Sequence, residues 1–396
     1  MSGSLSVLFI GGGTGGHIYP NLAVAERMAE LAAEQGQTRP RRVFVTSERP
    51  IDARILGGAL ERGEADAHAT LPMRPLSPRP VKLMRCLASW GPSVRAARAL
   101  IRSERHEADR VVAVSTGGFV SAPAAQACRV EGVPIAAVQL DAAAGVASRF
   151  VAARASRRFA ASAAAAGDGW EAIPPVVRRI ALAGASPERA RAELGLDPDR
   201  QTLLVVGGSQ GAGSINELVP ALARANPEAL RAGGWQILHL SGPGQAGPGR
   251  AEGVRTAYAD ARADAVVLES LDAMGLAWSA ATLAIGRGGA GTVAEAMASA
   301  TPIAVLPYPH HRDRHQARNA QPLVDRGLAV VLTDHADLAA NLAAHAERLA
   351  ALLAAPPAGP QNRGGPGSQQ IDETAGGMTG GMTDGAAVVA RAVLGL

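Results

Sequence analysis

Short apolar runs alternate along the first part of the chain with longer, alanine-rich stretches of helical periodicity. The apolar runs are continuous rather than alternating in polarity, which is typical of parallel strands that are covered on both faces. Strands that alternate with helices in this way predict a doubly wound α/β fold. We expect strands at 5–10, 43–46, 111–114 and 135–138, and helices at about 21–34 and 122–129.

The same pattern restarts later in the chain, with a glycine loop and a helix again following a strand. We expect strands at 203–206, 236–240, 265–268, 283–285 and 303–306, and a helix from about 216. The segment 181–201 contains Pro187, Pro198 and many charged residues, so we interpret it as a linker. The sequence therefore predicts two similar α/β domains, at 1–180 and 202–355, with a ligand-binding cleft between them.

The C-terminal part has a different composition. Residues 356–385 are rich in Gly, Pro and Met and contain almost no large apolar side chain, so we expect a flexible segment there. Residues 386–396 are apolar again. We expect them to form a terminal helix that packs back on the body of the protein.

Composition excludes several classes of protein. Of the 396 residues, 47% are hydrophobic and 19% charged, as in a globular protein with a substantial core. Aromatic residues make up 3% and the net charge is +4, so we expect no nucleic-acid surface. Two cysteines provide neither a disulfide framework nor a cysteine zinc site. We find no signal peptide and no membrane-spanning run, and therefore expect a cytoplasmic protein.

A glycine-rich motif, GGGTGGH at 11–17, follows the first expected strand and precedes a helix. Glycines there let the backbone approach a ligand, and the N–H groups of a helix N-terminus attract an anion. A structural turn, a dinucleotide fingerprint and a P-loop are the alternatives. Glu48 stands farther along than the dinucleotide fingerprint requires, and His17 replaces the P-loop lysine. His17 is either structural or a general base.

A second motif, GGSQGAGSIN at 207–216, has the same strand-to-helix setting. Its G-x-S-x-G pattern matches the nucleophile elbow of serine hydrolases, with Ser209 as the nucleophile. His310, His311 or His315 would then be the base. Alternatively, the loop cradles a phosphate and Ser209 donates its hydroxyl, an interpretation that also accounts for the repeated glycine loops.

A third motif, GRGGAGTVAEAM at 286–297, again joins a strand to a helix. Arg287 offers a cation, and the backbone of 288–292 offers N–H groups. We expect Glu295 in the first helical turn. Its carboxylate either complements the helix dipole there or accepts two hydroxyls of a ribose.

The segment 307–323 is rich in histidine, and His311 and His315 lie four residues apart. This pair either binds a metal ion or belongs to a polar loop that donates hydrogen bonds to the ligand. We favour the polar loop, because no matching carboxylate pattern supports a metal site.

Apolar and basic side chains are mixed in the segment 81–98. That composition suits contact with an anionic membrane surface. An ordinary amphipathic surface helix, interrupted by Gly91 and Pro92, is the alternative.

Together these motifs resemble the MurG family of peptidoglycan glycosyltransferases, over roughly residues 7–331. GGGTGGHIYPNLAVAERM, STGGFVSAPA and VVGGSQGAGSIN are similar to the family's three glycine loops, and GRGGAGTVAEAMASATPIAVLPYP followed by HQARNA is the most specific stretch. The resemblance implies two Rossmann-like domains facing across a cleft, which is the GT-B fold. It also implies that UDP-N-acetylglucosamine is held mainly by the C-terminal domain, without a metal ion or cofactor.

The reaction implied by the resemblance is inverting transfer of N-acetylglucosamine to the 4-hydroxyl of undecaprenyl-pyrophosphoryl-N-acetylmuramyl-pentapeptide. His17 matches the candidate base, Ser209 the donor-diphosphate serine, and Gln316 the glutamine on the sugar hydroxyls. Leu271 matches a backbone contact to uracil, and Glu295 matches the ribose carboxylate. Further family positions at the diphosphates and the nucleotide correspond to Thr14, Gly15, Gly16, Ala290, Gly291, Thr292, Val293 and Ala294.

Three departures from the family pattern lie on the acceptor side or at the domain junction. Asp141 replaces a substrate-contacting asparagine, and we consider it a substrate contact and a second candidate base. The family arginine maps to Arg178 with a shift of one residue, and Phe119 replaces a common tyrosine. A transferase of the same fold with another lipid or small-molecule acceptor is therefore an alternative, as is a nucleotide-binding module without catalysis.

The expected mechanism is a single displacement at the anomeric carbon, with the acceptor hydroxyl deprotonated by His17. The N–H groups near Ser209 and Thr292 would stabilise the leaving diphosphate. We expect the enzyme to be peripheral, on the cytoplasmic face of the cell membrane, and in contact with anionic lipid.

Overall fold

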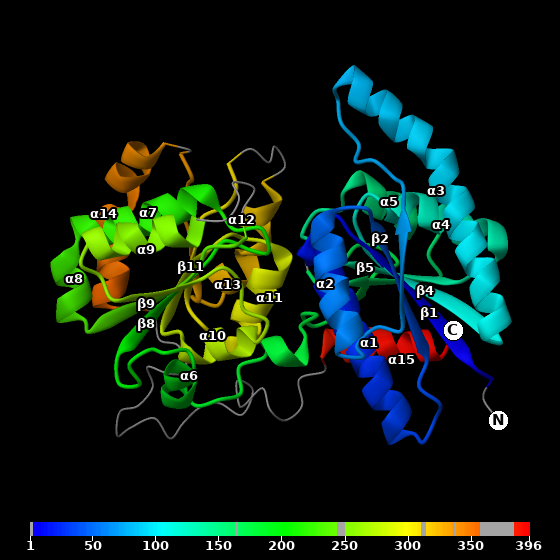
Figure 1. The fold of residues 1–396 in the computed structure, drawn as a ribbon, viewed down its shortest axis with the longest axis horizontal. Helices are drawn as coiled ribbons and strands as arrows, with labels where there is room; N and C mark the ends of the chain where they lie inside the picture. The colour runs from blue at the N-terminus through cyan, green and yellow to red at the C-terminus, as the bar shows by residue number, and fades with distance from the viewer. Residues whose placement is uncertain (1–2, 163–164, 244–249, 310–313, 336, 357–383) are drawn as a thin grey trace. The chain divides into compact units, whose positions relative to one another are not determined.

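The chain folds into two compact units, each with its own parallel β-sheet and helices on both faces of that sheet (Figure 1). The computed structural model describes residues 3–162, 165–243, 250–309, 314–335, 337–356 and 384–396. The first unit comprises Met1–Arg178 together with Thr383–Leu396, and the second comprises Arg179–Met382. The predicted α/β class with two parallel sheets is confirmed.

Seven strands are formed by the described residues of the first unit: β1 (Leu5–Gly11), β2 (Arg41–Ser47), β3 (Ala67–Leu71), β4 (Arg110–Gly117), β5 (Ile135–Gln139), β6 (Arg157–Ala160) and β7 (Glu171–Ala172). Its helices are α1 (Gly15–Glu34), α2 (Pro50–Glu61), α3 (Pro80–Glu107), α4 (Ser121–Glu131), α5 (Val146–Ala152) and, from the C-terminus, α15 (Gly385–Leu394). The sheet order is β3-β2-β1-β4-β5-β6-β7, and all neighbours are parallel. The order reverses between β1 and β4, as in doubly wound folds.

Two apolar layers hold the first sheet between its helices. One layer is formed with α1, α2 and α15, and there Phe9 stacks on Phe44 with ring centroids 5.0 Å apart. The other is formed with α3, α4 and α5. Val389 of α15 is fully buried, and Asp384 caps this helix and forms an ion pair with the buried Arg27 of α1. The C-terminal helix is thus part of the core of the first unit.

In the second unit, the residues that the structure describes form six strands: β8 (Gln201–Val206), β9 (Trp235–Leu240), β10 (Ala265–Leu268), β11 (Leu283–Gly286), β12 (Ile303–Val305) and β13 (Ala329–Val331). Its helices are α6 (Pro187–Glu193), α7 (Gly213–Ala225), α8 (Pro227–Ala232), α9 (Arg250–Asp260), α10 (Met274–Ala280), α11 (Ala290–Ser299), α12 (His315–Asn319), α13 (Gln321–Val324) and α14 (Leu338–Ala354). The sheet order is β10-β9-β8-β11-β12-β13, with all neighbours parallel. The order reverses between β8 and β11, so the second unit repeats the topology of the first.

Several boundaries differ from the sequence-based expectation. Helix α1 begins at Gly15 rather than near residue 21, and α7 begins at Gly213 rather than near residue 216. Both helices therefore start directly at the end of a glycine loop. Helix α3 is continuous, so Gly91 and Pro92 do not interrupt it, contrary to that expectation. The strands β3, β6, β7 and β13 are absent from the sequence-based prediction.

The expected linker and the expected flexible segment have different outcomes. Within 181–201, helix α6 forms, and its Ala190 is fully buried in the core of the second unit. The segment 356–385 lies outside the described residues except at its two ends.

Candidate active site

Glycine-rich loops follow β1 and β4 in the first unit and β8 and β11 in the second, each at the carboxyl end of its strand. Ligands of doubly wound sheets bind at the carboxyl ends of the strands that flank the reversal in strand order. Most residues that the sequence analysis singled out lie on these loops or on the helices that follow them.

The loops after β1 and β4 fit closely against each other. Gly13 has a φ of +93°, and a Cβ there would lie 2.6 Å from the Phe119 ring. Gly118 has a φ of +86°, and a Cβ there would lie 2.5 Å from the carbonyl oxygen of Gly12. Because neither position accepts a side chain, these glycines are required for the contact between the loops themselves.

His17 lies in the first turn of α1, and its Nδ1 is 2.9 Å from the carbonyl oxygen of Thr116 at the end of β4. A carbonyl oxygen can only accept a hydrogen bond, so Nδ1 carries the proton and Nε2 carries the free lone pair. Gly117 and Gly118 leave room for the ring, because a Cβ at either would lie 3.3 Å from it. Of the two tautomers of a neutral ring, the contact with Thr116 thus selects the one in which Nε2 can accept a proton, as a general base requires.

The buried carboxylate of Asp52 accepts hydrogen bonds from the first glycine loop and holds it in place. Asp52 of α2 is fully buried, and it accepts hydrogen bonds from the N–H of Gly13 at 2.7 Å and from the N–H of Ser47 at 3.1 Å. Arg49 donates to the carbonyl oxygen of Gly13 at 2.8 Å. Both backbone groups of Gly13 are therefore used inside the protein. The sequence analysis missed Asp52, for which the signal is an acidic residue early in the helix after β2.

The start of α1 offers other backbone donors. Thr14 is the N-cap residue, and its side chain makes no capping hydrogen bond. Gly15 and Gly16 occupy the first turn, where N–H groups have no acceptor within the helix. These two N–H groups are candidates for an anionic part of a ligand.

The two remaining candidates of the first unit are Asp141 and Arg178. Asp141 is half-buried just after β5, and its carbonyl oxygen accepts a hydrogen bond from Gln139 at 2.8 Å. Arg178 is buried and forms an ion pair with Glu64 at 2.8 Å, while its Nε has no hydrogen-bond partner among the described residues. The Arg178 guanidinium is therefore committed in part to a contact within the first unit.

In the second unit, Ser209 is half-buried in the turn between β8 and α7. Helix α7 begins without a side-chain cap, so its first-turn N–H groups and the Ser209 hydroxyl together form a region rich in donors. Of the three histidines considered as partners of Ser209, His310 and His311 lie outside the described residues, and His315 begins α12.

A buried hydrogen-bonded chain supports this loop. The Nδ2 of Asn216 donates to the carbonyl oxygen of Ser241 at 3.0 Å, so its Oδ1 accepts from Nε2 of His239 at 3.1 Å. Tyr258 then donates its hydroxyl to Nδ1 of His239 at 2.8 Å. Burial lowers the pKa of His239 to about 4, which keeps the ring neutral. The sequence analysis did not find this chain, since its members lie on α7, β9 and α9.

Arg287, expected as a cation for the ligand, is buried and bonded within the protein. Its Nη1 donates to Asp334 at 2.8 Å and to the carbonyl oxygen of Leu306 at 2.8 Å. Its Nη2 donates to Ser214, which in turn donates to Asp334 at 2.7 Å. Arg287 thereby ties the loop after β11 to the start of α7 and to the loop before α14.

Helix α12 packs against the loop that follows β11. A Cβ at Gly288 would lie 2.2 Å from the carbonyl oxygen of Gln316, so the glycine permits this approach. Asn319 donates to the carbonyl oxygen of Gly288 at 2.9 Å. The side chain of Gln316 accepts a hydrogen bond from the N–H of Tyr308 at 2.8 Å. These contacts place Gln316 beside the segment that joins β11 to α11, residues 287–289, which we call the candidate nucleotide loop.

The candidate nucleotide loop leads into α11, whose N-terminus has no side-chain cap. Its first residues are Ala290, Gly291, Thr292, Val293 and Ala294. Glu295 follows them in the second turn, not in the first as expected, because the helix begins at Ala290. Interaction with the helix dipole therefore accounts less well for the presence of this carboxylate, since the dipole effect fades beyond the first turn. Leu271 is half-buried against the core that contains α10 and α11.

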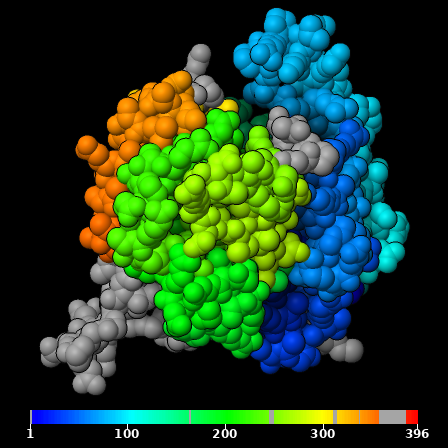
Figure 2. Space-filling view, turned by 60° about the vertical axis from the view of Figure 1, so that its left-hand side comes forward, coloured from blue at the N-terminus to red at the C-terminus, as the bar shows by residue number. Residues whose placement is uncertain are grey.

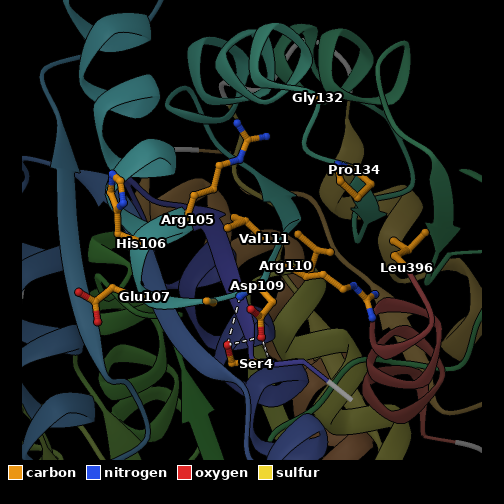
Figure 3. Close-up of a pocket in the computed structure, with 12 residues that line it drawn as sticks. Ser4, Arg105, His106, Glu107, Asp109, Arg110, Val111, Gly132, Pro134 and Leu396 are labelled. Carbon is orange, nitrogen blue, oxygen red and sulfur yellow. Dashed lines mark hydrogen bonds between the residues drawn. The ribbon is translucent and has the colours of Figure 1, made fainter. Parts of the chain in front are cut away.

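A hollow in the first unit lies elsewhere. Figure 3 shows it at the amino ends of β1 and β4, the edge of the sheet opposite the glycine loops. Its volume is about 540 Å³, and Ser4, Arg105 and Asp109 are among its lining residues. Ser4 and Asp109 are hydrogen-bonded to each other, and Arg105 is paired with Glu131. Because it lies at the edge of the sheet opposite the glycine loops, this hollow does not contribute to the candidate active site.

Among the described residues, no group of three or more His, Cys, Asp or Glu side chains is arranged to hold a metal ion. His311 and Asp313, which belong to the histidine-rich segment, lie outside those residues.

The N-terminal half of α3 projects from the body of its own unit (Figures 1 and 2). Val81, Met84 and Leu87 are 62%, 70% and 66% exposed there, and Lys82 and Arg85 lie exposed between them. In the part of the chain that the structure describes, none of the helices combines the length and apolar character needed to span a membrane.

Comparisons with known proteins cover both units. The model of the glycosyltransferase family 28 N-terminal domain matches residues 7–160, and that of the C-terminal domain matches residues 202–355. A Nocardioides protein named UDP-N-acetylglucosamine–N-acetylmuramyl-(pentapeptide) pyrophosphoryl-undecaprenol N-acetylglucosamine transferase is 36% identical, over 89% of this chain and 93% of its own. A Sorangium cellulosum protein of the same name is 33% identical, over 88% of this chain and 81% of its own.

The fold has counterparts among solved structures. The crystal structure of Acinetobacter baumannii MurG superposes with a TM-score of 0.61 at 21% identity, and covers 99% of this chain and 100% of its own. At that identity the likeness concerns the fold.

Proposed function

The chain belongs to glycosyltransferase family 28, and from this premise we propose that it transfers N-acetylglucosamine from UDP-N-acetylglucosamine to the 4-hydroxyl of undecaprenyl-pyrophosphoryl-N-acetylmuramyl-pentapeptide. The strongest support is 36% identity, over 89% of the chain, to a transferase named for these substrates. Such a reaction belongs to peptidoglycan synthesis. The serine hydrolase and the non-catalytic module have no comparable support.

We assign the base to His17. Its Nδ1 proton is held by the carbonyl oxygen of Thr116, which leaves Nε2 to take the proton from the acceptor hydroxyl. The hydroxyl oxygen then forms a bond to the anomeric carbon while the bond from that carbon to the UDP oxygen breaks. A single displacement of this kind inverts the anomeric configuration. Asp141 is the second candidate base and a contact for the acceptor.

The second unit supplies the donor site in this proposal. Negative charge develops on the leaving diphosphate, and the uncapped N-termini of α7 and α11 offer N–H groups and positive dipole ends to that charge. The Ser209 hydroxyl adds a further donor. Glu295 accepts the ribose hydroxyls, Gln316 binds the sugar hydroxyls, and the backbone of Leu271 contacts the uracil.

Arg287 and Arg178 act indirectly in this proposal. The guanidinium of Arg287 donates hydrogen bonds to Asp334, Ser214 and Leu306. We therefore assign Arg287 to holding the loops of the nucleotide-sugar site in place. Arg178 keeps its ion pair with Glu64 and contributes positive charge on the acceptor side.

We further propose that the protein is peripheral on the cytoplasmic face of the cell membrane, with the N-terminal half of α3 against anionic lipid. Three large apolar side chains stand exposed there between basic ones. An amphipathic surface of this composition binds by burying apolar area and by attraction to lipid charge.

The decisive experiment is transfer of labelled sugar from UDP-N-acetylglucosamine to a soluble analogue of the lipid-linked acceptor, with EDTA present. We expect labelled disaccharide product whose new glycosidic bond is inverted. Glu295→Ala run in parallel should bind UDP more weakly. Absence of product from a protein that still binds UDP would overturn the assigned acceptor.

A further inference from the structure

Glu295 has a buried partner that the proposed reaction does not yet use. Trp278 of α10 is completely buried, and its Nε1 lies 2.7 Å from Oε2 of Glu295 on α11. An indole N–H can only donate, so the carboxylate oxygen accepts. The two helices pack in one apolar core, which fixes the ring and with it the direction of the hydrogen bond.

Because of the surroundings of Glu295, this hydrogen bond influences whether the carboxyl group is ionised. Burial raises the pKa of Glu295 to about 7, whereas the bond from Trp278 lowers it. Helix α10 has no ionisable side chain, and α11 has none besides Glu295. Helix α12, which also packs on α11, brings His315 and Arg318. Neither of these charges is among the causes of the shift, so the indole is the group that favours the carboxylate form.

We propose that Trp278 is a positioning residue for the donor: its indole N–H holds Glu295 in the orientation and charge state in which the carboxylate accepts the vicinal hydroxyls of a nucleoside diphosphate's ribose. This inference rests on the proposed function. A carboxylate anion accepts hydrogen bonds through both oxygens, whereas a protonated carboxyl offers fewer acceptor sites. Trp278 therefore acts on donor binding through Glu295 without touching the substrate.

The first test is Trp278→Phe, which keeps an aromatic ring and removes the N–H. At about pH 7 we expect the KM for UDP-N-acetylglucosamine to rise about tenfold, as befits loss of one hydrogen bond to a charged group. The kcat should stay unchanged. As the pH rises toward about 9, Glu295 ionises in the variant too, and the ratio of its KM to that of the wild type should fall.

Trp235→Phe is the matched control. Trp235 is also buried in the second unit, and its Nε1 donates to the carbonyl oxygen of Leu353 at 3.0 Å, a contact outside the candidate site. This variant loses a buried indole hydrogen bond as well, yet its KM should keep the wild-type dependence on pH. The same pH dependence of KM in both tryptophan variants would overturn the proposal.

A double variant separates action through Glu295 from a structural effect. On a Glu295→Gln background, Trp278→Phe should add no further increase in KM, because the group that the indole holds is gone. An additive increase, or a KM ratio for Trp278→Phe that does not change with pH, would show that Trp278 acts by packing alone and would overturn the proposal.

A measurement on the wild-type fold covers the case in which Trp278→Phe does not fold, and it needs no substrate. In protein labelled with ¹⁵N-tryptophan, one indole N–H signal should titrate with a midpoint near pH 7, and Glu295→Gln should abolish that titration. If no indole signal titrates there, the Trp278 proposal fails. If the signal titrates but UDP does not change it, the contact stands and the proposed donor fails instead.

Discussion

The Nδ1 proton of His17 is held by the carbonyl oxygen of Thr116, so removing the ring removes a base that is already oriented. We expect His17→Ala to lower kcat about 10²–10⁴-fold, the range typical of general acid–base catalysis. The KM for the nucleotide sugar should change little, because the proposed donor contacts lie in the second unit. Steady-state kinetics would measure both constants. His106→Ala, which alters an exposed histidine of the same unit, is the control, and an unchanged kcat in His17→Ala would remove the base role.

Two adjacent glycines offer a second test at this scale. A Cβ at Gly288 would lie 2.2 Å from the carbonyl oxygen of Gln316, whereas at Gly289 nothing lies within 4 Å. Overpacking of this kind costs about 1–3 kcal/mol, so Gly288→Ala should lower stability by that amount. It should also raise the donor KM by displacing Gln316. Gly289→Ala is the matched control, and equal behaviour of the two variants in thermal unfolding and kinetics would contradict the packing argument.

Single residues also show where prediction from sequence stops. The motifs predicted that His17 and Ser209 lie in glycine-rich stretches between a strand and a helix, because a motif records neighbours in sequence; in the structure His17 belongs to the first turn of α1. Asp52, which holds Gly13, lies 39 positions away, and Asp334, which holds Arg287, lies 47 positions away. No local pattern encodes such partners. For this reason the sequence indicated Arg287 as a ligand contact, whereas in the structure its guanidinium is hydrogen-bonded inside the protein.

At the scale of elements, α3 presents the clearest surface for a test. Burying a large apolar side chain fully is worth about 1.5–3 kcal/mol, so Met84→Ser with Leu87→Ser should weaken binding to anionic vesicles at least tenfold. Co-sedimentation with vesicles of anionic and of neutral lipid would measure this. Val130→Ser is the control, because Val130 is 52% exposed on α4 of the same unit. If the double variant binds like the wild type, α3 is not the membrane contact.

How well each strand could be predicted from the sequence depends on how deeply the strand is buried. The central strands β1, β4, β8 and β11 are buried on both faces and read as unbroken apolar runs, which made them predictable. Strand β6 begins with two arginines and β3 is largely half-exposed, so neither produces such a run. Strand β13 does lie in an apolar run, at 328–332, and the prediction missed it although the signal was present. Helix α1 begins within glycines that the motif assigned to the loop, which explains its misplaced start.

At the scale of the whole molecule, two ionisable groups of the second unit, His239 and Glu295, oppose each other in their effect on stability. The pKa of His239 is lowered from 6.5 to about 4, so the unfolded chain binds more protons there and stability falls as the pH drops through that window. The pKa of Glu295 is raised from 4.5 to about 7, so the folded chain binds more protons and stability falls as the pH rises through that window. Each effect amounts to about 3 kcal/mol at most, and the two largely cancel between them.

The two opposing effects on stability can be measured separately by mutating one group at a time. In His239→Gln, we expect the free energy of unfolding of the variant to decline as the pH rises from about 4.5 to about 7, because the Glu295 effect is no longer opposed. In Glu295→Gln, the free energy of unfolding of the variant should decline as the pH falls from about 6.5 to about 4, because the His239 effect is no longer opposed. Urea unfolding of the full chain at a series of pH values would measure both slopes. Parallel curves for the two variants would show that these groups do not govern the pH response.

The packing of α15 against α1 has a consequence for the order in which the protein can be completed during synthesis. The apolar face of α1 is translated before the second unit, but the helix that covers this face, α15, is translated after it. The entire second unit is translated in between. Throughout that interval the nascent first unit exposes an uncovered apolar strip, which favours chaperone binding and, if translation stops early, aggregation. A premature stop just before residue 384 would remove α15 and leave the core of the first unit incomplete, although only the C-terminal segment is missing.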